Sequence, residues 1–297
     1  MSARTLVVQS VLYGTPADAL LRAAEALANS AQLAVEAGQL STWALALGDC
    51  SPEPVMTPEV RVRLEEVLGL GGGSLSSEFF GENLGSAAGH NRIAKRSDSD
   101  LILILNPDAQ VAPDALTELA KRCVDDVGIA EARQVPFEHP KDYAVGDGDT
   151  SWASTACAMT PRAVFDSIGG FDARSFFLYC DDVDYSWRVR LAGHRVVYVP
   201  SAAVFHDKRL SVTGDWPASP AEIYYSAEAA LILAHKYSHP EIVAGLEKAY
   251  RRDTNETVAR ALAEFRRRRA AGELVDSIDP GHRVGEFVKG NYSVHRF

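Results

Sequence analysis

A short polar segment, Asn106-Pro107-Asp108, directly follows the apolar run Leu-Ile-Leu-Ile-Leu at residues 101–105. Such a run is typical of a strand that is buried on both faces of a parallel sheet, and Pro107 ends it. A carboxylate at the end of a buried strand can hold a divalent cation, which can neutralise a diphosphate leaving group. On these three residues alone, a favourable turn is the more frequent explanation. Asp108 is therefore a candidate metal ligand, and the neighbouring segments decide between this role and a simple turn.

Three carboxylates, Asp181, Asp182 and Asp184, lie within four residues at the start of a predicted helix. The helix dipole favours negative charge there, and Asp181 and Asp184 have the spacing of a capping box. Capping does not explain Asp182. An ionised Asp182 could accept the proton of an attacking hydroxyl group, and a solvated surface carboxylate is the equal alternative.

His206 follows a predicted strand at 195–199 and the turn at Pro200. A neutral imidazole at this position can ligate a metal, although a lone histidine is more often a surface or core residue. Two cations come next, Lys208 and Arg209. They could balance the charge of a diphosphate even though the whole chain is acidic.

Glycines and polar side chains lie together just upstream of the apolar run. Gly85 and Gly89 allow a close approach of the backbone to a ligand. The side chains that offer donors to a ribose or a diphosphate are Asn83, Asn91 and Arg92. The beginning of an ordinary helix is the alternative. Because the glycines precede the strand, the segment matches neither the dinucleotide motif G-x-G-x-x-G nor a P-loop.

Apolar stretches alternate with Ala/Leu-rich or amphipathic stretches in the first hundred residues. This pattern predicts strands at 6–12, 42–47 and 101–105 and helices at 17–37 and 60–68. The expected fold is α/β, with a Rossmann-like, doubly wound and mostly parallel central sheet and flanking helices. Ligands of such sheets bind beyond the carboxyl ends of the strands, where Asp108 lies.

The later part of the chain supplies an irregular stretch and a helical end. Trp152 lies in a loop at 135–155 and is a candidate stacking platform under a sugar ring, with ordinary anchoring of the loop as the alternative. Short helices are expected at 160–168 and around the three carboxylates. The basic run at 266–269 indicates a solvated helix end, or else a docking patch for anionic lipid.

These elements suggest a division of the chain into two parts. We expect a catalytic domain at 1–218, with a nucleotide-binding half at 1–110 and an acceptor-side half at 111–218. A helical C-terminal extension and tail should occupy 219–297.

The composition is that of an ordinary soluble domain, with 46% hydrophobic and 24% charged residues in a chain of 297. A net charge of -10 argues against a general nucleic-acid binder, whose affinity depends on neutralising phosphates. The four cysteines contain no CxxC pair, so we expect reduced thiols rather than a zinc or redox motif. We find no signal peptide and no apolar window long enough to span a membrane, which favours a cytoplasmic protein.

Several segments in a fixed order resemble family 2 glycosyltransferases, especially their bacterial rhamnosyltransferase-like branch. They are Asn-Pro-Asp-Ala after an apolar strand, Gly-Gly-Phe-Asp at 169–172, Phe-Phe-Leu-Tyr-Cys-Asp-Asp-Val-Asp-Tyr-Ser-Trp-Arg at 176–188, a Gly-x-x-Val strand and Pro-Ser-Ala-Ala-Val-Phe-His at 200–206. The resemblance is strong between about residues 80 and 210 and weak outside this range.

The resemblance implies a GT-A fold, a nucleotide-sugar donor, and inversion at the anomeric carbon with Mn²⁺ or Mg²⁺ bridging the diphosphate. Asp108 matches the metal ligand of the family's D-x-D motif, and His206 matches a second metal contact. Asn106 replaces the first Asp of that motif and is expected beside the donor. In the carboxylate pair Asp181-Asp182, the second residue matches the base that deprotonates the acceptor.

The same resemblance places nucleoside contacts at the ends of the first two strands. Asp49 matches the carboxylate that reads the nucleobase. Gln9, Val11 and Tyr13 are the corresponding candidates on the first strand, where the segment Gln-Ser-Val-Leu-Tyr-Gly-Thr-Pro departs from the family's usual one.

The expected function is inverting transfer of a hexose, with rhamnose favoured by resemblance, from a TDP- or UDP-sugar to a glycan, lipid-linked or other hydroxyl acceptor. Trp152 and Asp184 are the expected acceptor contacts. Peripheral association with the inner face of a membrane and a homodimer are further expectations.

Two other functions fit the same residues. A sugar nucleotidyltransferase also places carboxylates and a metal at strand ends, but the chain has no Gly-rich triphosphate loop near its N-terminus. The other is a catalytically inert sugar- or nucleotide-binding module of a glycan assembly complex.

Overall fold

The apolar run forms a central strand, β4 (Leu101–Leu105), which is buried along its whole length. Its three leucines face one hydrophobic core and its two isoleucines face another. Because successive side chains of a strand point to opposite faces, a strand without polar positions must lie between two layers. The parts of the chain that this computed structural model describes are residues 3–138, 141–206 and 218–293.

Eight strands form one sheet in the described part of the chain, in the order β3-β2-β1-β4-β7-β6-β8-β5. The other strands are β1 (Arg4–Leu12), β2 (Leu40–Asp49), β3 (Ser74–Phe79), β5 (Ala109–Val111), β6 (Val127–Val135), β7 (Cys157–Pro161) and β8 (Arg195–His206). The parallel pairs are β1 with β2, β1 with β4, β2 with β3 and β6 with β8. Strands β7 and β5 are antiparallel to their neighbours. The predicted mostly parallel α/β sheet is confirmed, with two reversed strands in its second half.

Four of these strands, β3, β5, β6 and β7, are not predicted by the sequence pattern. Strand β3 carries three serines and a glutamate in six residues, and β5 has only three residues. The helix expected at 160–168 begins only at Arg162, because Thr160 and Pro161 pair with β4 as the end of β7. The strand expected at 195–199 continues to His206.

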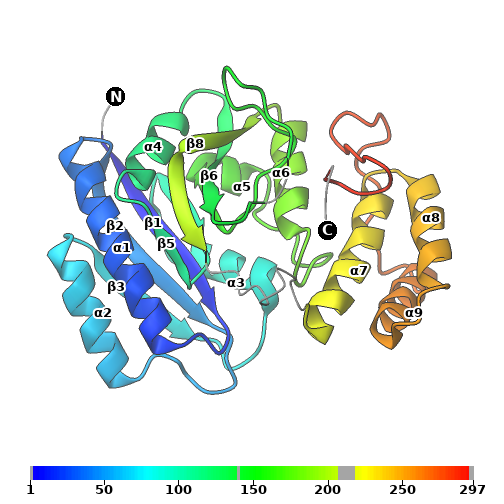
Figure 1. The fold of residues 1–297 in the computed structure, drawn as a ribbon, viewed down its shortest axis with the longest axis horizontal. Helices are drawn as coiled ribbons and strands as arrows, with labels where there is room; N and C mark the ends of the chain where they lie inside the picture. The colour runs from blue at the N-terminus through cyan, green and yellow to red at the C-terminus, as the bar shows by residue number, and fades with distance from the viewer. Residues whose placement is uncertain (1–2, 139–140, 207–217, 294–297) are drawn as a thin grey trace.

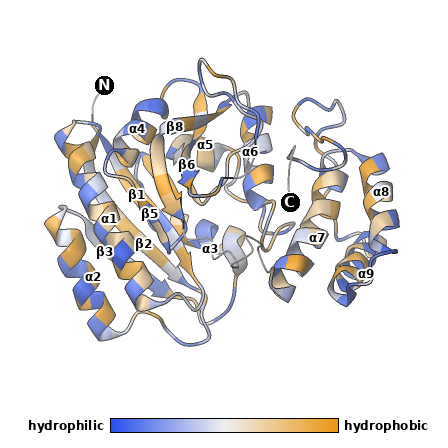
Figure 2. Ribbon diagram, viewed as in Figure 1, coloured by the Kyte–Doolittle hydropathy of each residue, from blue (hydrophilic) through white to orange (hydrophobic). Residues whose placement is uncertain are grey.

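Helices cover both faces of the sheet (Figure 1). They are α1 (Ala17–Glu36), α2 (Pro58–Leu70), α3 (Gly85–Ala94), α4 (Ala115–Arg122), α5 (Arg162–Ser167) and α6 (Asp181–Leu191). Helices α1, α2 and α4 share a core with one face, and α3, α5 and α6 share a core with the other. Figure 2 shows the matching pattern, with hydrophobic strands in the middle and mixed colours along the outer helices.

The C-terminal region forms a group of three helices beside α6 (Figure 1). They are α7 (Pro220–Lys236), α8 (Pro240–Tyr250) and α9 (Glu256–Ala270). A third core joins them to Val183 and Trp187 of α6 and to Trp152. The expected helical extension is therefore present, and it packs on the outer side of a helix of the sheet domain. The domain boundaries stay predictions.

Two further observations concern the class of protein. In the described segments, no helix is long and apolar enough to cross a membrane. The four cysteines are free and buried, in agreement with the expected thiols.

Candidate active site

The polar segment after β4 and the end of β8 come together through β5. The chain turns at Asn106, where the carbonyl accepts a hydrogen bond from the Ala109 N–H at 3.0 Å. It then returns as β5, whose first residue lies opposite His206 in the antiparallel pair with β8. As a result, Asp108 Oδ1 lies 3.6 Å from His206 Nε2. The segment Asn106-Pro107-Asp108 thus forms a turn, and that turn also places the Asp108 carboxylate beside the His206 imidazole.

Neighbouring amides hold the imidazole of His206. The Asn106 Nδ2 lies 3.2 Å from His206 Nε2, and the Gln134 Oε1 lies 3.4 Å from His206 Nδ1. Because an amide nitrogen only donates and an amide oxygen only accepts, a neutral ring with its proton on Nδ1 satisfies both contacts. In this tautomer the lone pair on Nε2 accepts from the Asn106 amide, so a cation at Nε2 would have to displace that hydrogen bond.

The geometry of Asp108 and His206 fits two ligands of one cation. Two adjacent ligands at about 2.1 Å from a Mg²⁺ ion in octahedral geometry are about 3 Å apart, close to the distance between the two atoms here. The Asp108 side chain is 44% exposed and that of His206 14%, so the position is open to solvent on the aspartate side. Among the residues that the structure describes, no group of three or more His, Cys, Asp or Glu side chains could hold a metal ion. A cation here would therefore need ligands beyond these side chains of the described residues.

Helix α6 starts from two consecutive residues in the left-handed region, Tyr179 with φ 66° and Cys180 with φ 54°. This conformation is costly for side chains other than glycine, and it persists only where the surroundings enforce it. Cys180 is the N-cap residue, and no side chain caps the helix. The predicted capping box of Asp181 and Asp184 is therefore wrong, because the N-cap is a left-handed cysteine and the Asp184 carboxylate is bound elsewhere.

The carboxylates of Asp181 and Asp182 have different surroundings. Asp181 is 5% exposed, and its Oδ2 has no hydrogen-bond partner among the described residues. Burial, together with the charge of Asp182, raises the pKa of Asp181 to about 7, although a hydrogen bond from Ser86 opposes this shift. Asp182 is less buried, and its Oδ1 accepts a hydrogen bond from the Val183 N–H at 2.8 Å. Of the two, Asp182 is the more accessible, and Asp181 can keep a proton near neutral pH.

A short connection links the start of α6 to the segment after β4. The Ser186 hydroxyl donates to the Asp182 carbonyl at 2.8 Å and accepts from the Ala153 N–H at 3.0 Å. Three residues later, the Ala156 carbonyl accepts from the Asn106 N–H at 2.9 Å. Because three residues span at most about 11 Å, this route limits the separation between the start of α6 and the segment after β4.

Two of the expected nucleoside contacts are buried and used by the protein itself. Gln9 is fully buried, and with its amide oxygen and nitrogen exchanged it donates to the His90 carbonyl and accepts from the Ala94 N–H, both at 3.3 Å. Asp49 lies at the end of β2 as predicted, but it is 1% exposed. Its oxygens accept the N–H groups of the following loop at 3.0 and 2.7 Å. The predicted contacts of Gln9 and Asp49 with a nucleoside are therefore wrong for this conformation, since both groups already hold internal partners.

The two glycines of α3 are needed by the protein rather than by a ligand. A Cβ at Gly89 would lie 2.8 Å from a methyl group of Val11, and one at Gly85 would lie 2.3 Å from the Phe177 carbonyl oxygen. The prediction that they face a ligand is thus corrected. Val11 is partly buried against α3, and its contact with a nucleoside stays a prediction. Tyr13 at the end of β1 is 60% exposed, and its contact with a nucleoside stays a prediction.

Asn91 is an anchor for the Gly-Gly-Phe-Asp segment. Its Nδ2 donates to the Phe171 carbonyl at 2.7 Å, and its Oδ1 accepts from the Phe171 N–H at 2.8 Å. A Cβ at Gly170 would lie 2.4 Å from the same Oδ1, which explains the glycine. The predicted role of Asn91 as a donor to the ligand is wrong, because both ends of its amide are occupied.

Arg92 and Asn83 also have partners within the protein. Arg92 donates through Nε and Nη2 to Glu78 Oε1 at 3.0 and 2.5 Å, and its side chain is 39% exposed, so its contact with a diphosphate stays a prediction. The Asn83 Oδ1 accepts a hydrogen bond from the Gly85 N–H at 3.1 Å. The residue is exposed, and its amide nitrogen makes no hydrogen bond to the residues that the structure describes. The contact of Asn83 with a donor stays a prediction.

Trp152 is a core residue. It is 2% exposed, with the Lys141 ammonium 4.1 Å from its ring centre and the edge of Tyr292 at 5.3 Å. It lines a cavity of about 270 Å³ between the loop before it, α6 and the C-terminal tail, whose lining includes neither Asp108 nor Asp182. The predicted sugar platform is therefore wrong, and anchoring of the loop is the observed role.

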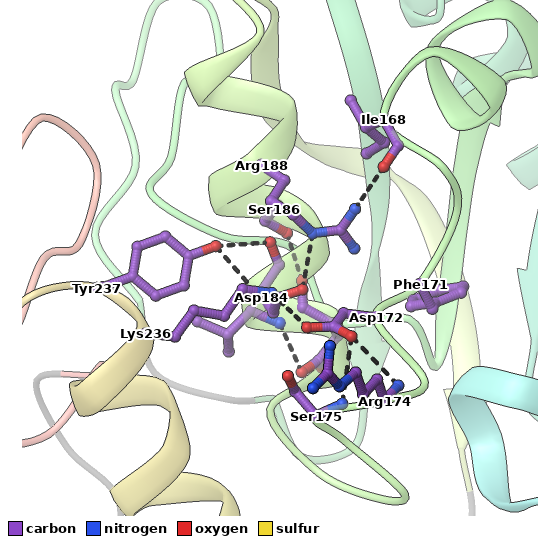
Figure 3. Close-up of polar contacts among 12 residues, drawn as sticks. Ile168, Phe171, Asp172, Arg174, Ser175, Asp184, Ser186, Arg188, Lys236 and Tyr237 are labelled. Carbon is purple, nitrogen blue, oxygen red and sulfur yellow. Dashed lines mark hydrogen bonds and ion pairs between the residues drawn. The ribbon is translucent and has the colours of Figure 1, made fainter. Parts of the chain in front are cut away.

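Asp184, the other expected acceptor contact, is completely buried between α6 and α7 (Figure 3). Its carboxylate bonds to Arg188 at 2.8 Å, to Lys236 at 2.5 Å and to the Tyr237 hydroxyl at 3.1 Å. An acceptor cannot reach it, so that prediction is also corrected.

The basic side chains expected to serve phosphates or lipids divide into two groups. Lys208 and Arg209 lie outside the described residues. Each arginine of the run 266–269 pairs with a glutamate, the partners being Glu228, Glu247, Glu264 and Glu273. The run is therefore a neutralised helix end and does not support a docking patch for anionic lipid.

Two residues in this region, Gln134 and Lys236, were not identified from the sequence. Gln134 orients His206 from the end of β6, and it could be found only once β6 is known to run parallel to β8. Lys236 pairs with Asp172 and Asp184. A lone lysine in the apolar helix segment Ala-Ala-Leu-Ile-Leu-Ala-His-Lys was a usable signal, since buried cations require partners.

Comparisons with known proteins agree with this architecture. No family model matches the chain. An N-acetylglucosaminyl-diphospho-decaprenol L-rhamnosyltransferase of Mycobacterium tuberculosis is 39% identical over 99 residues, which are 33% of this chain and 30% of the relative. Rhamnosyltransferase WbbL of Escherichia coli strain K12 is 33% identical over 67 residues, 23% of this chain and 25% of the relative. The matched stretches thus span less than a third of these relatives.

Solved structures share the fold at low sequence identity. The mannosyltransferase PcManGT from Pyrobaculum calidifontis, in complex with GDP-Man and Mn²⁺, matches 92% of this chain and 83% of its own with a TM-score of 0.57 and 16% identity. GalNAc-T7 with UDP, GalNAc and Mn²⁺ matches 93% of this chain and 56% of its own with a TM-score of 0.63 and 11% identity. The fold is GT-A, and the resemblance to family 2 glycosyltransferases of the rhamnosyltransferase-like branch is confirmed.

Proposed function

We propose that this relative of the rhamnosyltransferases is an inverting, metal-assisted glycosyltransferase that uses a nucleoside-diphosphate sugar. The observation that carries the proposal is the pair of Asp108 and His206, 3.6 Å apart at the sheet edge, together with the hydrogen-bonded route that leads from Asn106 to the start of α6, which bears Asp182. Asp108 and His206 suit a cation that accompanies a diphosphate, and Asp182 suits removal of a proton from the acceptor. The names of the sequence relatives support the same class of reaction.

The proposed reaction is a single displacement. Asp182 takes the proton of the acceptor hydroxyl, and the acceptor oxygen forms a bond to the anomeric carbon of the donor. The bond between that carbon and the diphosphate oxygen breaks, and its electron pair leaves with the nucleoside diphosphate. The accessibility of Asp182, beside a more buried Asp181, supports the assignment of the base.

A divalent cation, Mn²⁺ or Mg²⁺, would be held by Asp108 and His206 and would supply charge neutralisation to the departing diphosphate. The Gln134 amide oxygen, on Nδ1, keeps the His206 ring in the orientation that this requires, and the Asn106 amide would give up its contact with Nε2 to the cation. The open side of Asp108 leaves space for oxygens of the diphosphate to complete the ligand set.

The donor sugar and the acceptor are proposed from the relatives alone. Rhamnose is favoured because the sequence relatives are named rhamnosyltransferases, and TDP and UDP are the candidate nucleotides. One relative is named for an acceptor built on decaprenyl diphosphate, which supports a glycan on a lipid carrier as the acceptor class. Such an acceptor would bring the reaction to a membrane surface.

The experiment that tests the proposal is a thermal-shift panel of TDP-, UDP- and GDP-sugars with and without Mn²⁺, followed by measurement of nucleoside-diphosphate release. A donor at about 100 times its Kd should add about 2.7 kcal/mol to the free energy of unfolding, and the gain should require the metal. Release of nucleoside diphosphate should follow addition of an acceptor.

Other outcomes favour the alternative functions. Release of pyrophosphate from a sugar 1-phosphate and a nucleoside triphosphate would indicate a nucleotidyltransferase. Donor binding without transfer or hydrolysis would indicate an inert binding module. No response to any nucleotide or metal would reject the proposal.

A further inference from the structure

A buried cluster of charges joins α6 to α7 (Figure 3). Lys236, the last residue of α7, lies 2.5 Å from Asp184 Oδ1 and 2.7 Å from Asp172 Oδ2. Arg188 binds the other oxygen of Asp184 at 2.8 Å. The Tyr237 hydroxyl donates to Asp184 Oδ1 and to the Asp184 carbonyl, both at 3.1 Å. We refer to Asp172, Asp184, Arg188, Lys236 and Tyr237 as the α6–α7 charge cluster.

The charged side chains of the α6–α7 charge cluster balance each other. Two carboxylates face two cations, and the side chains of Lys236 and Asp184 are 4% and 0% exposed. Burial opposes ionisation of Asp172, but Lys236 and Ser175 outweigh it and lower the pKa of Asp172. Buried charges are tolerated only when they are paired, so the α6–α7 charge cluster holds the facing ends of its elements in one arrangement.

The α6–α7 charge cluster acts on the same helical turn that carries Asp182. Asp184 lies two residues after Asp182, and its N–H closes the first turn by donating to the Cys180 carbonyl at 2.9 Å. Cys180 and Tyr179 hold left-handed conformations that need outside support. The cap of this helix supplies none, because no side chain caps it. The fixed carboxylate of Asp184 is the buried, charged anchor of the turn, beside the bond from Ser186 to the Asp182 carbonyl and the bond of the Tyr179 hydroxyl to Glu222 at 3.1 Å.

We propose that Lys236 is a positioning residue for Asp182, so that the C-terminal extension is a working part of the catalytic centre. This inference rests on the proposed transferase function. Lys236 lies on a segment outside the sheet domain, yet it fixes the turn from which the base projects. Removal of its ammonium group should loosen that turn while the donor-side groups at Asp108 and His206 stay in place.

The chain offers a matched control on the same two structural parts. Arg190, also on α6, pairs with Glu286 of the C-terminal tail at 2.6 Å. Its side chain is 24% exposed and that of Glu286 is 55% exposed, so this link lies at the surface. If attachment of the extension alone mattered, loss of either link should have similar effects on turnover.

The experiment compares Lys236→Met, Lys236→Arg and Arg190→Met with the wild-type chain. Because Lys236→Met leaves a buried carboxylate unpaired and could prevent folding, the double variant Lys236→Met/Asp172→Asn is included. That variant removes one charge of each sign and leaves the pair of Asp184 with Arg188. Readouts are kcat, donor KM, and amide hydrogen exchange of residues 177–186.

We expect kcat to fall by roughly 10- to 100-fold in Lys236→Met and in the double variant, with donor KM unchanged, because a small displacement of a reacting group is enough. Lys236→Arg should lose less, and Arg190→Met should match the wild type. Amide exchange at 177–186 should be faster only when Lys236 is replaced by methionine.

A folded double variant with wild-type kcat and wild-type exchange would overturn the inference. So would an equal loss of kcat in Arg190→Met, or a donor KM that rises as kcat falls. If the wild-type chain transfers no sugar at all, the proposed function fails, and the exchange measurement alone then decides whether Lys236 holds the turn.

Discussion

The metal-ligand candidates and the start of α6 are built in opposite ways. Asp108 and His206 lie at an open edge, with the aspartate 44% exposed and no group of three or more candidate ligands in the described part of the chain. Asp181 and Asp182 begin a helix whose conformation is strained and whose first turn is anchored by buried ion pairs. Of the residues that the structure describes, two offer ligands in the first region, whereas several hold the second in place.

This difference fits a division of labour between substrate and protein. A cation that accompanies a diphosphate can take its missing ligands from the substrate, so the protein needs to offer only two. A base must already point at the acceptor before the reaction starts, because misplacement directly lowers the rate. Mutations in the open region should therefore affect metal and donor binding, and mutations at α6 should affect turnover.

The largest effect is expected for Asp182→Asn. Loss of the general base should lower kcat by about 100- to 10,000-fold, while donor binding stays unchanged because the variant keeps the size of the side chain. Nucleoside-diphosphate release gives kcat, and the metal-dependent thermal shift gives donor binding. Asp18→Asn, which changes a carboxylate that is 73% exposed on α1, is the control and should retain wild-type turnover. Wild-type kcat in Asp182→Asn would show that another group takes the proton.

A smaller loss is expected for Asp108→Asn, and of a different kind. The amide is a weaker ligand, so kcat/KM should fall by roughly 100-fold, which corresponds to about 3 kcal/mol. The stabilisation by donor and Mn²⁺ together should also decrease, and higher Mn²⁺ should restore part of the activity. Asp114→Asn at the N-terminus of α4, where the side chain makes no capping bond, is the matched control. An Mn²⁺ dependence identical to that of the wild type would remove Asp108 from the metal site.

The fold could be predicted where the sequence pattern is local and strong. The run Leu-Ile-Leu-Ile-Leu and the alternation of strands and helices before it determine the central sheet. Strand β7 was missed because Thr160 and Pro161 suit the start of a helix, and only their pairing with β4 makes them strand. Strand β8 was predicted too short, because its continuation depends on the partner β6.

The site could be predicted only in its outline. Residue type, places at strand or helix ends and the family resemblance made Asp108, His206 and Asp182 candidates, and their roles stay predictions. The sequence could not reveal that Asn91 and Asp49 bind backbone groups of their own fold, because a polar side chain looks the same whether its partner is a ligand or a distant loop. Asp184 was misjudged for the same reason, since its partner Lys236 is 52 residues away.

Asp181 should give the stability of the protein a pH dependence opposite to that of a paired carboxylate. Its folded pKa is about 7 and its ordinary value is 3.8, so between these values only the folded state keeps the proton. The favourable contribution is therefore complete at low pH and is lost as the pH rises through about 7.

Asp181→Asn removes this titration. Relative to the wild type, the free energy of unfolding of the variant should increase by roughly 2 kcal/mol between about pH 5 and about pH 8. Urea denaturation at several pH values measures the difference. A difference that does not change with pH would mean that Asp181 is ionised in the folded protein throughout this range.

The smallest effect is expected for Asn91→Ala, which tests whether the Asn91 amide supports the fold or binds the donor. Asn91→Ala removes two hydrogen bonds to Phe171 and leaves backbone groups unpaired, which should cost about 1–2 kcal/mol of stability without raising the donor KM. Asn83→Ala is the matched comparison, since Asn83 is exposed and bonds only to a neighbouring N–H in the described contacts. Its stability should change by less than about 0.5 kcal/mol, and its donor KM should rise if it contacts the donor as predicted. Urea denaturation and donor titrations of both variants decide the question.

A raised donor KM with unchanged stability in Asn91→Ala would mean that its amide turns from Phe171 to the donor during binding, and the open region would then extend as far as α3.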